Sequence, residues 1–223
     1  MEDAEMFYKL DNMSLGFKNY AELKLLSKIQ NFNPKSILEI GSGNGHFLKN
    51  FTNIEHYGID KNLSMVILAN KNGIDVKYCD ILVENNLKNV VGNKVDIICA
   101  NYVFTEMKYL ELKVCFQNIY RQLNDKGHLC FTITNPRENH RKIFPDYRVI
   151  FEEKYEYYKR DIPFRVELKD ENGDFTEVGI LDYHKPVSDY NYLLKECGFS
   201  ILSIDEIYRN LPYPHALLYD VQK

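Results

Sequence analysis

The sequence predicts an open, mostly parallel α/β sheet with helices on both faces, and three observations support this fold class. Short β-branched runs alternate with helical patterns up to residue 134, a mixed-charge stretch then interrupts the alternation, and the final two strand candidates have no helix between them. The missing helix predicts that the last strand is antiparallel. The expected strands are residues 36–40, 56–60, 76–79, 95–100, 128–134, 199–207 and 216–222.

A β-hairpin is expected between the fifth strand and the last helix. Apolar and charged residues alternate over 164–169, and an Asn-Gly pair at 172–173 supplies turn chemistry. The preceding segment, 137–161, interleaves basic and acidic residues and is interpreted as solvated helix or loop. The last helix is expected to have Ser188 as its N-cap and Gly198 as its C-terminal stop.

Length and composition predict one globular domain without a metal or disulfide framework. The chain has 223 residues, a formal charge of −4, and 45% hydrophobic and 27% charged residues. Its five cysteines form no C-x-x-C pair and mostly lie in apolar runs, which is typical of reduced core residues. The acidic balance disfavours nucleic acid as a partner. No apolar stretch reaches membrane-spanning length and the N-terminus is acidic, so a cytoplasmic protein with no membrane partner is expected.

Three alternate glycines follow the first expected strand and precede a helical pattern. Gly41, Gly43 and Gly45 allow the backbone to turn sharply and to approach a ligand closely. A dinucleotide-binding G-x-G-x-x-G sequence would have its third glycine at position 46, where this chain has His46. No Gly-Lys-Ser/Thr follows, so a phosphate-binding P-loop is also excluded. At this point a ligand loop and a simple tight turn both remain possible explanations of the glycines.

The pattern E-x-G-x-G-x-G, from Glu39 to Gly45, resembles the cofactor loop of class I S-adenosylmethionine-dependent methyltransferases. The resemblance extends over most of the chain and implies a seven-stranded Rossmann-like sheet with an inserted hairpin lid. It also implies a single domain, residues 1–223, with S-adenosylmethionine as cofactor and S-adenosylhomocysteine as product. Within it, residues 1–33 are an N-terminal helical cap, 34–134 the cofactor-binding core, 135–186 the lid over the acceptor, and 187–223 the C-terminal helix and last two strands.

The resemblance implies that specific residues of this chain bind the cofactor. Asp60 ends the second strand and is expected to accept both ribose hydroxyls; Asp80 is expected to meet the adenine amino group, with Ile81 covering the ring. A turn or helix-cap role is the alternative for Asp80. Asn101 and Tyr102 follow the fourth strand and are expected beneath the methionine half. The full set is Glu39, Gly41, Ser42, Gly43, Gly45, Asp60, Lys61, Asp80, Ile81, Asn101 and Tyr102.

Missing motifs disfavour several classes of methyl acceptor and leave a small molecule as the leading class. The segment after the fourth strand lacks the Pro-Pro of enzymes that methylate exocyclic base amines, and no proline precedes a cysteine as in cytosine C5 enzymes. Glu106 and Glu111 are too close in sequence for the paired-glutamate loop of protein arginine methyltransferases. Asn101 stands where magnesium-dependent catechol enzymes have Asp. We therefore expect transfer to an oxygen or nitrogen of a small metabolite. The alternatives are a catalytically inactive or regulatory S-adenosylmethionine-binding protein and a macromolecular acceptor.

The catalytic prediction falls on His184. It lies in a Tyr-His-basic-Pro segment that resembles one found in methyltransferases acting on small molecules, and a histidine can take an acceptor proton near neutral pH. A hydrogen-bonded structural histidine is the alternative. Many family members have histidine where this chain has Thr105 and Glu106, which leaves the base open. Glu106 is also a candidate contact for a cationic acceptor, with a solvated helix-start glutamate as the alternative.

Overall fold

The computed structural model describes residues 17–145, 147–169 and 172–223, without the side chains of 17–19 and 178. Residues 1–16 of the expected N-terminal cap lie outside this part of the chain. The strands are β1 Ser36–Ile40, β2 Glu55–Asp60, β3 Val76–Tyr78, β4 Val95–Asn101, β5 Leu123–Thr134, β6 Tyr147–Phe151, β7 Ile162–Lys169, β8 Phe175–His184, β9 Ser200–Ile207 and β10 Ala216–Gln222. The helices are α2 Phe17–Gln30, α3 Leu63–Lys71, α4 Asn86–Val91, α5 Tyr109–Gln122 and α6 Val187–Glu196, with 3-10 turns η1 Phe47–Phe51, η2 Phe104–Glu106 and η3 Asn139–Arg141.

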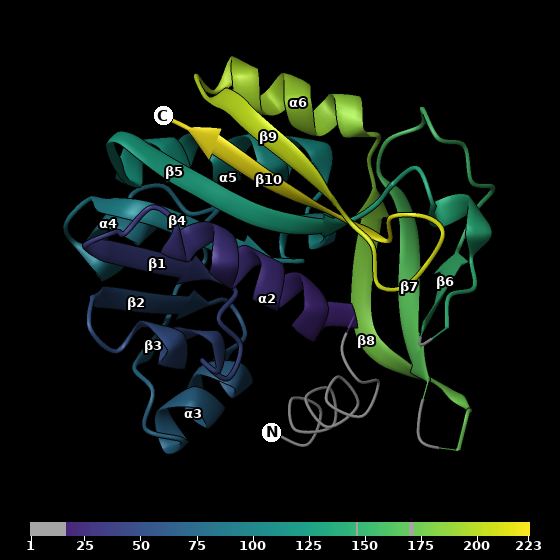
Figure 1. Cartoon of the computed structure of the whole chain (residues 1–223), viewed down its shortest axis with the longest axis horizontal. Coiled ribbons are helices and arrows are strands. Elements are labelled where there is room, and N and C mark those ends of the chain that lie inside the picture. Colours follow the sequence, from purple (N-terminus) through teal and green to yellow (C-terminus); the bar gives the residue numbers. More distant parts are fainter. Residues whose placement is uncertain (1–16, 146, 170–171) are drawn as a thin grey trace.

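Seven strands form one sheet in the order β3-β2-β1-β4-β5-β10-β9 (Figure 1). The first five strands in this order are parallel, and β10 runs antiparallel to both β5 and β9. The predicted pairing of the last two strands is therefore confirmed. Because β10 lies between β5 and β9, the antiparallel strand is internal to the sheet rather than at its edge.

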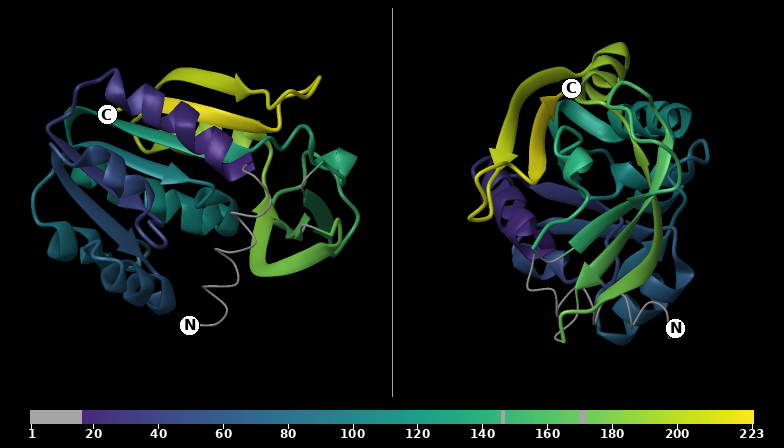
Figure 2. Two further views of the ribbon diagram at one scale, coloured as in Figure 1. Left: turned by 60° about the horizontal axis from the view of Figure 1, so that its bottom comes forward. Right: turned by 90° about the vertical axis from the view of Figure 1, so that its right-hand side faces the viewer.

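Helices cover both faces of this sheet because the buried strands alternate their side chains between the two faces. Ile37 packs with Ala21, Leu25 and Ile29 of α2 on one face, whereas the next residue, Leu38, belongs to the larger cluster that contains α5 and α6 on the other face. Figure 2 shows α2 lying along the sheet, with α5 on the opposite side. None of the described helices is long and apolar enough to cross a membrane.

The expected hairpin is present and belongs to a second, three-stranded sheet, β6-β7-β8. Strands β7 and β8 pair antiparallel up to Lys169 and Phe175. The interpretation of 137–161 as solvated helix or loop is wrong for part of that segment, because β6 pairs with β7 and buries Tyr147 and Val149. The strand was not predicted because charged residues are interleaved throughout this segment and only two of the five residues of β6, Tyr147 and Val149, are buried. We call the segment 135–186 the lid.

The last helix begins two residues earlier than the sequence predicts. Pro186 is the N-cap of α6 and Ser188 lies inside its first turn, so the predicted cap at Ser188 is wrong. The proline has an extended conformation, with φ −63° and ψ 154°, which starts the helix without a side-chain cap. Gly198 follows the helix with φ +96°, as expected of a C-terminal stop.

Candidate active site

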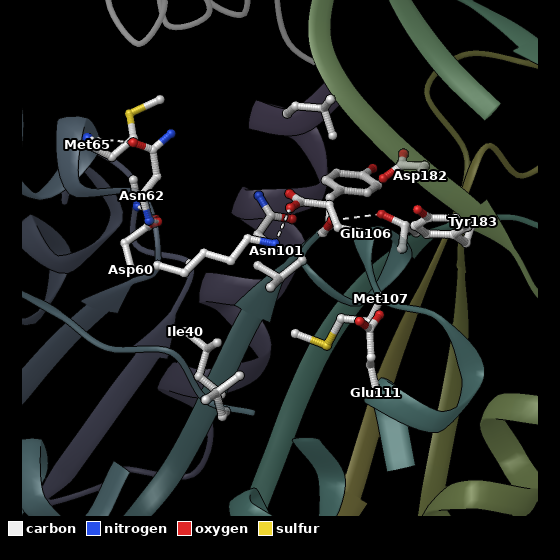
Figure 3. Close-up of a pocket in the computed structure, with 18 of the residues that line it drawn as sticks. Ile40, Asp60, Asn62, Met65, Asn101, Glu106, Met107, Glu111, Asp182 and Tyr183 are labelled. Atoms are coloured by element: carbon white, nitrogen blue, oxygen red, sulfur yellow. Dashed lines mark hydrogen bonds and ion pairs between the residues drawn. The ribbon is translucent and has the colours of Figure 1, made fainter. Parts of the chain in front are cut away.

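A cavity of about 890 Å³ lies between the carboxyl ends of the parallel strands and the lid (Figure 3). Its core half is formed by the loops that follow β1, β2, β3 and β4. Its lid half is formed by the segment from Thr105 to Glu111 and by strands β7 and β8. Open α/β sheets bind ligands at this edge, where the loops between strands and helices converge.

The glycine loop of the core half depends on the absence of side chains. Gly41 has φ +68°, and a Cβ there would lie 2.4 Å from Cγ2 of Val103. Gly43 has φ +54°, but a Cβ there would meet no atom within 4 Å. Both residues line the cavity. The missing side chain of Gly41 thus allows the loop to pack closely against Val103, which follows β4. The missing side chain of Gly43 leaves open space beside the loop.

Glu39, Ser42 and Gly45 support this loop but do not line the cavity. The Ser42 hydroxyl donates to the Glu39 carbonyl at 3.1 Å, and the Gly45 N–H donates to the Ser42 carbonyl at 2.8 Å. A Cβ at Gly45 would lie 2.5 Å from Cγ2 of Ile74. These three residues therefore stabilise the conformation of the loop without contacting the cavity.

Asp60 joins the glycine loop to the end of β2. Its Oδ2 accepts the Gly43 N–H at 2.8 Å and its Oδ1 accepts the Asn62 N–H at 2.7 Å. Each carboxylate oxygen can accept a further hydrogen bond. Asp60 and Lys61 both line the cavity (Figure 3), so the carboxylate is oriented by the backbone while its remaining lone pairs are available to a ligand.

Asp80 has a turn role as well as a position on the cavity wall. Its Oδ1 accepts the Leu82 N–H at 2.9 Å, and Asn86 Nδ2 donates to its carbonyl at 3.0 Å. This is the geometry of an aspartate turn. Asp80 and Ile81 nevertheless line the same wall of the cavity, so the turn presents both residues to a ligand.

Asn101 and Tyr102 close the core half at the end of β4. The Thr132 hydroxyl donates to Asn101 Oδ1, which directs the amide nitrogen away from Thr132. That Nδ2 is buried and has no hydrogen-bond partner in the described part of the chain. Tyr102 adopts φ +61°, an uncommon conformation for a non-glycine residue. An unpartnered buried donor on a cavity wall fits a ligand with an acceptor oxygen.

Carboxylates dominate the lid half. Glu106 forms an ion pair with Lys61 at 3.1 Å, which joins the lid half to the core half. Asp182, on β8, is 6% exposed, and its Oδ1 has no hydrogen-bond partner among the described residues. Burial, with a smaller contribution from the nearby Glu106 carboxylate, raises the pKa of Asp182 to about 7. Asp182 can therefore gain and lose a proton near neutral pH.

Lys185 attaches the lid strand to the segment after β4. Its side chain is 1% exposed and its Nζ donates to the carbonyls of Met107 and Tyr183, the latter at 2.8 Å. Burial lowers the pKa of Lys185 to about 8. Met107 and Tyr183 both line the cavity, so this buried lysine sets the distance between two of its walls.

His184 is not brought to the cavity. Its ring is 1% exposed, with Nε2 at 2.9 Å from the Tyr157 carbonyl and Nδ1 at 3.4 Å from Asn139 Nδ2. The Tyr155 ring packs edge-on against it, with centroids 4.9 Å apart. Burial lowers the pKa of His184, which favours the neutral ring. The predicted base role stays a prediction that this position does not support.

Sequence reasoning missed Asp182 and Tyr183 as cavity residues. The proton-transfer role was assigned to His184 instead, because histidine is the usual proton acceptor at neutral pH. The available signal was an aspartate that follows two apolar residues, Ile180 and Leu181, on the far side of the expected hairpin turn. A charged residue in such a strand either faces solvent or occupies a polar site, and the sequence alone does not separate these two cases.

Comparison with known proteins agrees with this architecture. A protein-family model described as a methyltransferase domain matches residues 32–183, more than half of the chain. The chain therefore belongs to this methyltransferase family. No curated protein matches its sequence.

Solved structures with the same fold include an S-adenosylmethionine-dependent methyltransferase from Clostridium acetobutylicum, with 16% identity, a TM-score of 0.67, and 98% of this chain and 96% of that chain covered. CalS10 from Micromonospora echinaspora, an amino pentose methyltransferase bound to S-adenosylmethionine, is 14% identical, with a TM-score of 0.62 and coverage of 97% and 95%. DesVI from Streptomyces venezuelae is 15% identical, with a TM-score of 0.62 and coverage of 96% and 97%. At these identities the likeness concerns the fold.

S-adenosylmethionine is the cofactor of the class, and the core half fits it. The space beside Gly43 is open, Asp60 offers lone pairs toward the cavity edge, and Asn101 has a buried donor without a partner. A ligand with ribose hydroxyls and a carboxylate would satisfy these groups.

Proposed function

We propose that this chain transfers a methyl group from S-adenosylmethionine to an oxygen or nitrogen of a small-molecule metabolite. The observation that carries the proposal is one cavity shared by the glycine loop and the lid, with a volume of about 890 Å³. Ligand pockets typically measure about 300–1,000 Å³. This volume supports a cofactor and a small acceptor in contact with each other.

In this proposal the core half binds the cofactor. Asp60 accepts the ribose hydroxyls, Asp80 accepts from the adenine amino group, and Ile81 covers the ring. Gly41 and Gly43 lie beside the methionine half, with Asn101 and Tyr102 beneath it. Glu39, Ser42 and Gly45 hold the loop, and Lys61 orients Glu106 at the boundary with the lid half. The chain then acts as a single domain in which residues 135–186 cover the acceptor.

When bound, the cofactor supplies a methyl carbon on a positively charged sulfur, so the transfer is an in-line displacement. The protein has to hold the acceptor nucleophile on the far side of that carbon and exclude water. The exclusion of water is supported by Val166 and Leu168 of β7, which line the cavity with apolar side chains.

Calorimetric titration with S-adenosylmethionine, S-adenosylhomocysteine and NADH tests the cofactor assignment. We expect binding of the first two and none of NADH, together with formation of S-adenosylhomocysteine when small acceptors are added. Binding of NADH alone would overturn the proposal. Cofactor binding without turnover on any oxygen or nitrogen acceptor would favour the regulatory alternative, and turnover only on protein or nucleic acid would favour a macromolecular acceptor.

A further inference from the structure

The carboxylates of the lid half differ in their partners. Four of them line this half of the cavity, and three have a cation or a backbone N–H within reach. The partners are Lys61 for Glu106 at 3.1 Å, the backbone N–H of Lys108 for Glu111 at 2.8 Å, and Arg165 for Glu177 at 3.4 Å. Asp182 is the most deeply buried of the four, and its Oδ1 has no hydrogen-bond partner in the described part of the chain.

The charge around Asp182 favours a cationic ligand group. Over the whole cavity, six carboxylates stand against two lysines. Thr105 forms a hydrogen bond with Asp182, but Oδ1 has no partner among the described residues. A buried carboxylate oxygen without a partner is costly, and a ligand cation supplies both charge and a hydrogen bond, whereas a hydroxyl supplies only a hydrogen bond. Lys185, the buried cation behind the wall, directs its Nζ to two backbone carbonyls. The protein therefore leaves Asp182 Oδ1 without a direct cationic contact.

We propose that the methyl acceptor is a small molecule bearing a protonated amine, and that Asp182 binds this ammonium group and takes one of its protons before methyl transfer. This inference rests on the proposed function of the cavity. It commits the acceptor atom to nitrogen and assigns the proton to a residue that lines the cavity, beside Glu106 and Tyr183 (Figure 3).

The step balances in atoms and charge. Asp182 accepts a proton from the ammonium group, which leaves a neutral amine with a free electron pair. The nitrogen forms a bond to the methyl carbon, the carbon–sulfur bond breaks, and its electron pair goes to sulfur. The products are a methylated ammonium ion and the neutral thioether S-adenosylhomocysteine, and Asp182 later releases its proton to water.

The hydroxyl oxygen of Thr105 can accept a hydrogen bond from Asp182 when Asp182 is protonated. The Thr105 hydroxyl donates its only hydrogen to the Tyr102 carbonyl at 2.8 Å, so its oxygen remains an acceptor for a protonated Asp182. The pKa of Asp182, raised to about 7 by burial and by Glu106, suits a carboxyl that exchanges a proton near neutral pH. The hydrogen bond between Thr105 and Asp182, and to a smaller extent the charges of Lys185 and Lys61, oppose that rise in the pKa of Asp182.

Matched amine and alcohol probes test the inference. Phenethylamine and 2-phenylethanol have the same apolar body, so they differ in the group offered to Asp182. Binding of each, up to 10 mM, is measured by calorimetry on the full chain saturated with S-adenosylhomocysteine. We expect phenethylamine to bind at least about tenfold more tightly, as a charged hydrogen bond is worth about 1.5–3 kcal/mol. Its affinity should rise as pH increases from 6 to 8, because Asp182 ionises over this range.

Asp182→Asn keeps the shape of the side chain and removes its charge. In this variant phenethylamine should bind only about twofold more tightly than 2-phenylethanol, and the affinity for phenethylamine should no longer depend on pH. Glu177→Gln is the matched control, because it removes a carboxylate from the same strand that already has Arg165 as partner; most of the amine preference should remain. The affinity for S-adenosylhomocysteine should change less than threefold in both variants.

Three results would overturn the inference. They are equal binding or equal non-binding of the two probes by the wild-type chain, an unchanged amine preference in Asp182→Asn, and a loss of S-adenosylhomocysteine affinity in Asp182→Asn as large as the loss of amine affinity. The last result would assign Asp182 to the cofactor. Failure of the wild-type chain to bind S-adenosylhomocysteine would instead contradict the proposed function itself, so the two failures are distinguishable.

Discussion

The two halves of the cavity are built in different ways. In the core half, the polar groups are oriented by the backbone: Asp60 accepts two backbone N–H groups and Asp80 accepts one. In the lid half, Asp182 and Lys185 are buried, and Asp182 has a side-chain hydrogen bond with Thr105 while its Oδ1 has no partner among the described residues. Asp60 and Asp80 are thus held in a fixed geometry at half-buried positions. Buried side chains have shifted pKa values and depend on what the cavity contains.

The largest expected effect is a gain in the free energy of unfolding when the buried carboxyl of Asp182 is replaced. Between its usual pKa of 3.8 and the raised value of about 7, the folded state binds more protons at Asp182 than the unfolded state does. The contribution of Asp182 to stability therefore falls as pH rises through this range. At about 1.4 kcal/mol per pKa unit, removing the charge in Asp182→Asn should stabilise the apo protein at pH 8 by up to about 4 kcal/mol. Chemical denaturation at pH 5 and pH 8 measures this, with a much smaller gain expected at pH 5.

Asp60→Ala tests the backbone-held carboxylate of the core half. We expect cofactor affinity to fall by about 1.5–3 kcal/mol, because the variant lacks the carboxylate proposed to bind the ribose hydroxyls and the bonds that hold Gly43 and Asn62. Titration calorimetry with S-adenosylhomocysteine gives the value. Unchanged affinity would remove Asp60 from the binding site and weaken the contrast between the two halves.

Gly43→Ala and Gly45→Ala form a matched pair within the glycine loop. Both glycines have positive φ, which costs a residue with a Cβ about 1–2 kcal/mol. The added methyl group at Gly45 also meets Ile74, whereas at Gly43 it enters open space beside the cavity. Gly43→Ala should therefore weaken cofactor binding by about tenfold, and Gly45→Ala should mainly lower the melting temperature. Equal effects of the two changes on cofactor binding would show that loop shape alone controls it.

The smallest expected effect concerns His184. Because burial lowers its folded-state pKa below 6.5, its contribution to stability is present at neutral pH and is lost as pH falls through 6.5 toward the lowered pKa. His184→Gln should therefore lose less stability than the wild-type chain between pH 7 and pH 5, measured by thermal melts. If His184 is a base instead, turnover should fall about 10²–10⁴-fold while cofactor binding is retained.

Sequence patterns predicted the core half more fully than the lid half. Gly41, Asp60 and Asn101 line the cavity, as expected from their positions at or just after the end of a strand, because the carboxyl ends of parallel strands meet at one edge. The predicted cofactor roles of these residues stay proposals. The first five strands and the last two were also predicted, since β-branched and apolar residues recur in these segments between helical patterns or turns.

The lid half was harder because its structure depends on contacts distant in sequence. Strand β6 lies in a charged segment and is recognisable only through its pairing with β7. His184 and Asp182 are two residues apart on β8, yet the cavity reaches Asp182 and not His184. The difference is made by Tyr155 and Tyr157, which enclose the histidine ring. No local pattern in the sequence specifies that enclosure.

The lid begins and ends at nearly the same place. Asn139, near its start, lies 3.4 Å from His184, at its end. Because these two positions meet, the number of residues between them can change with little effect on the stability of the seven-stranded sheet. Doubling the length of a flexible loop adds only about 0.6 kcal/mol to the free energy of closing it. Over evolutionary time, such a junction lets insertions and replacements accumulate in the hairpin while the seven-stranded sheet persists. The repertoire of acceptors can then diversify independently of the machinery for the cofactor.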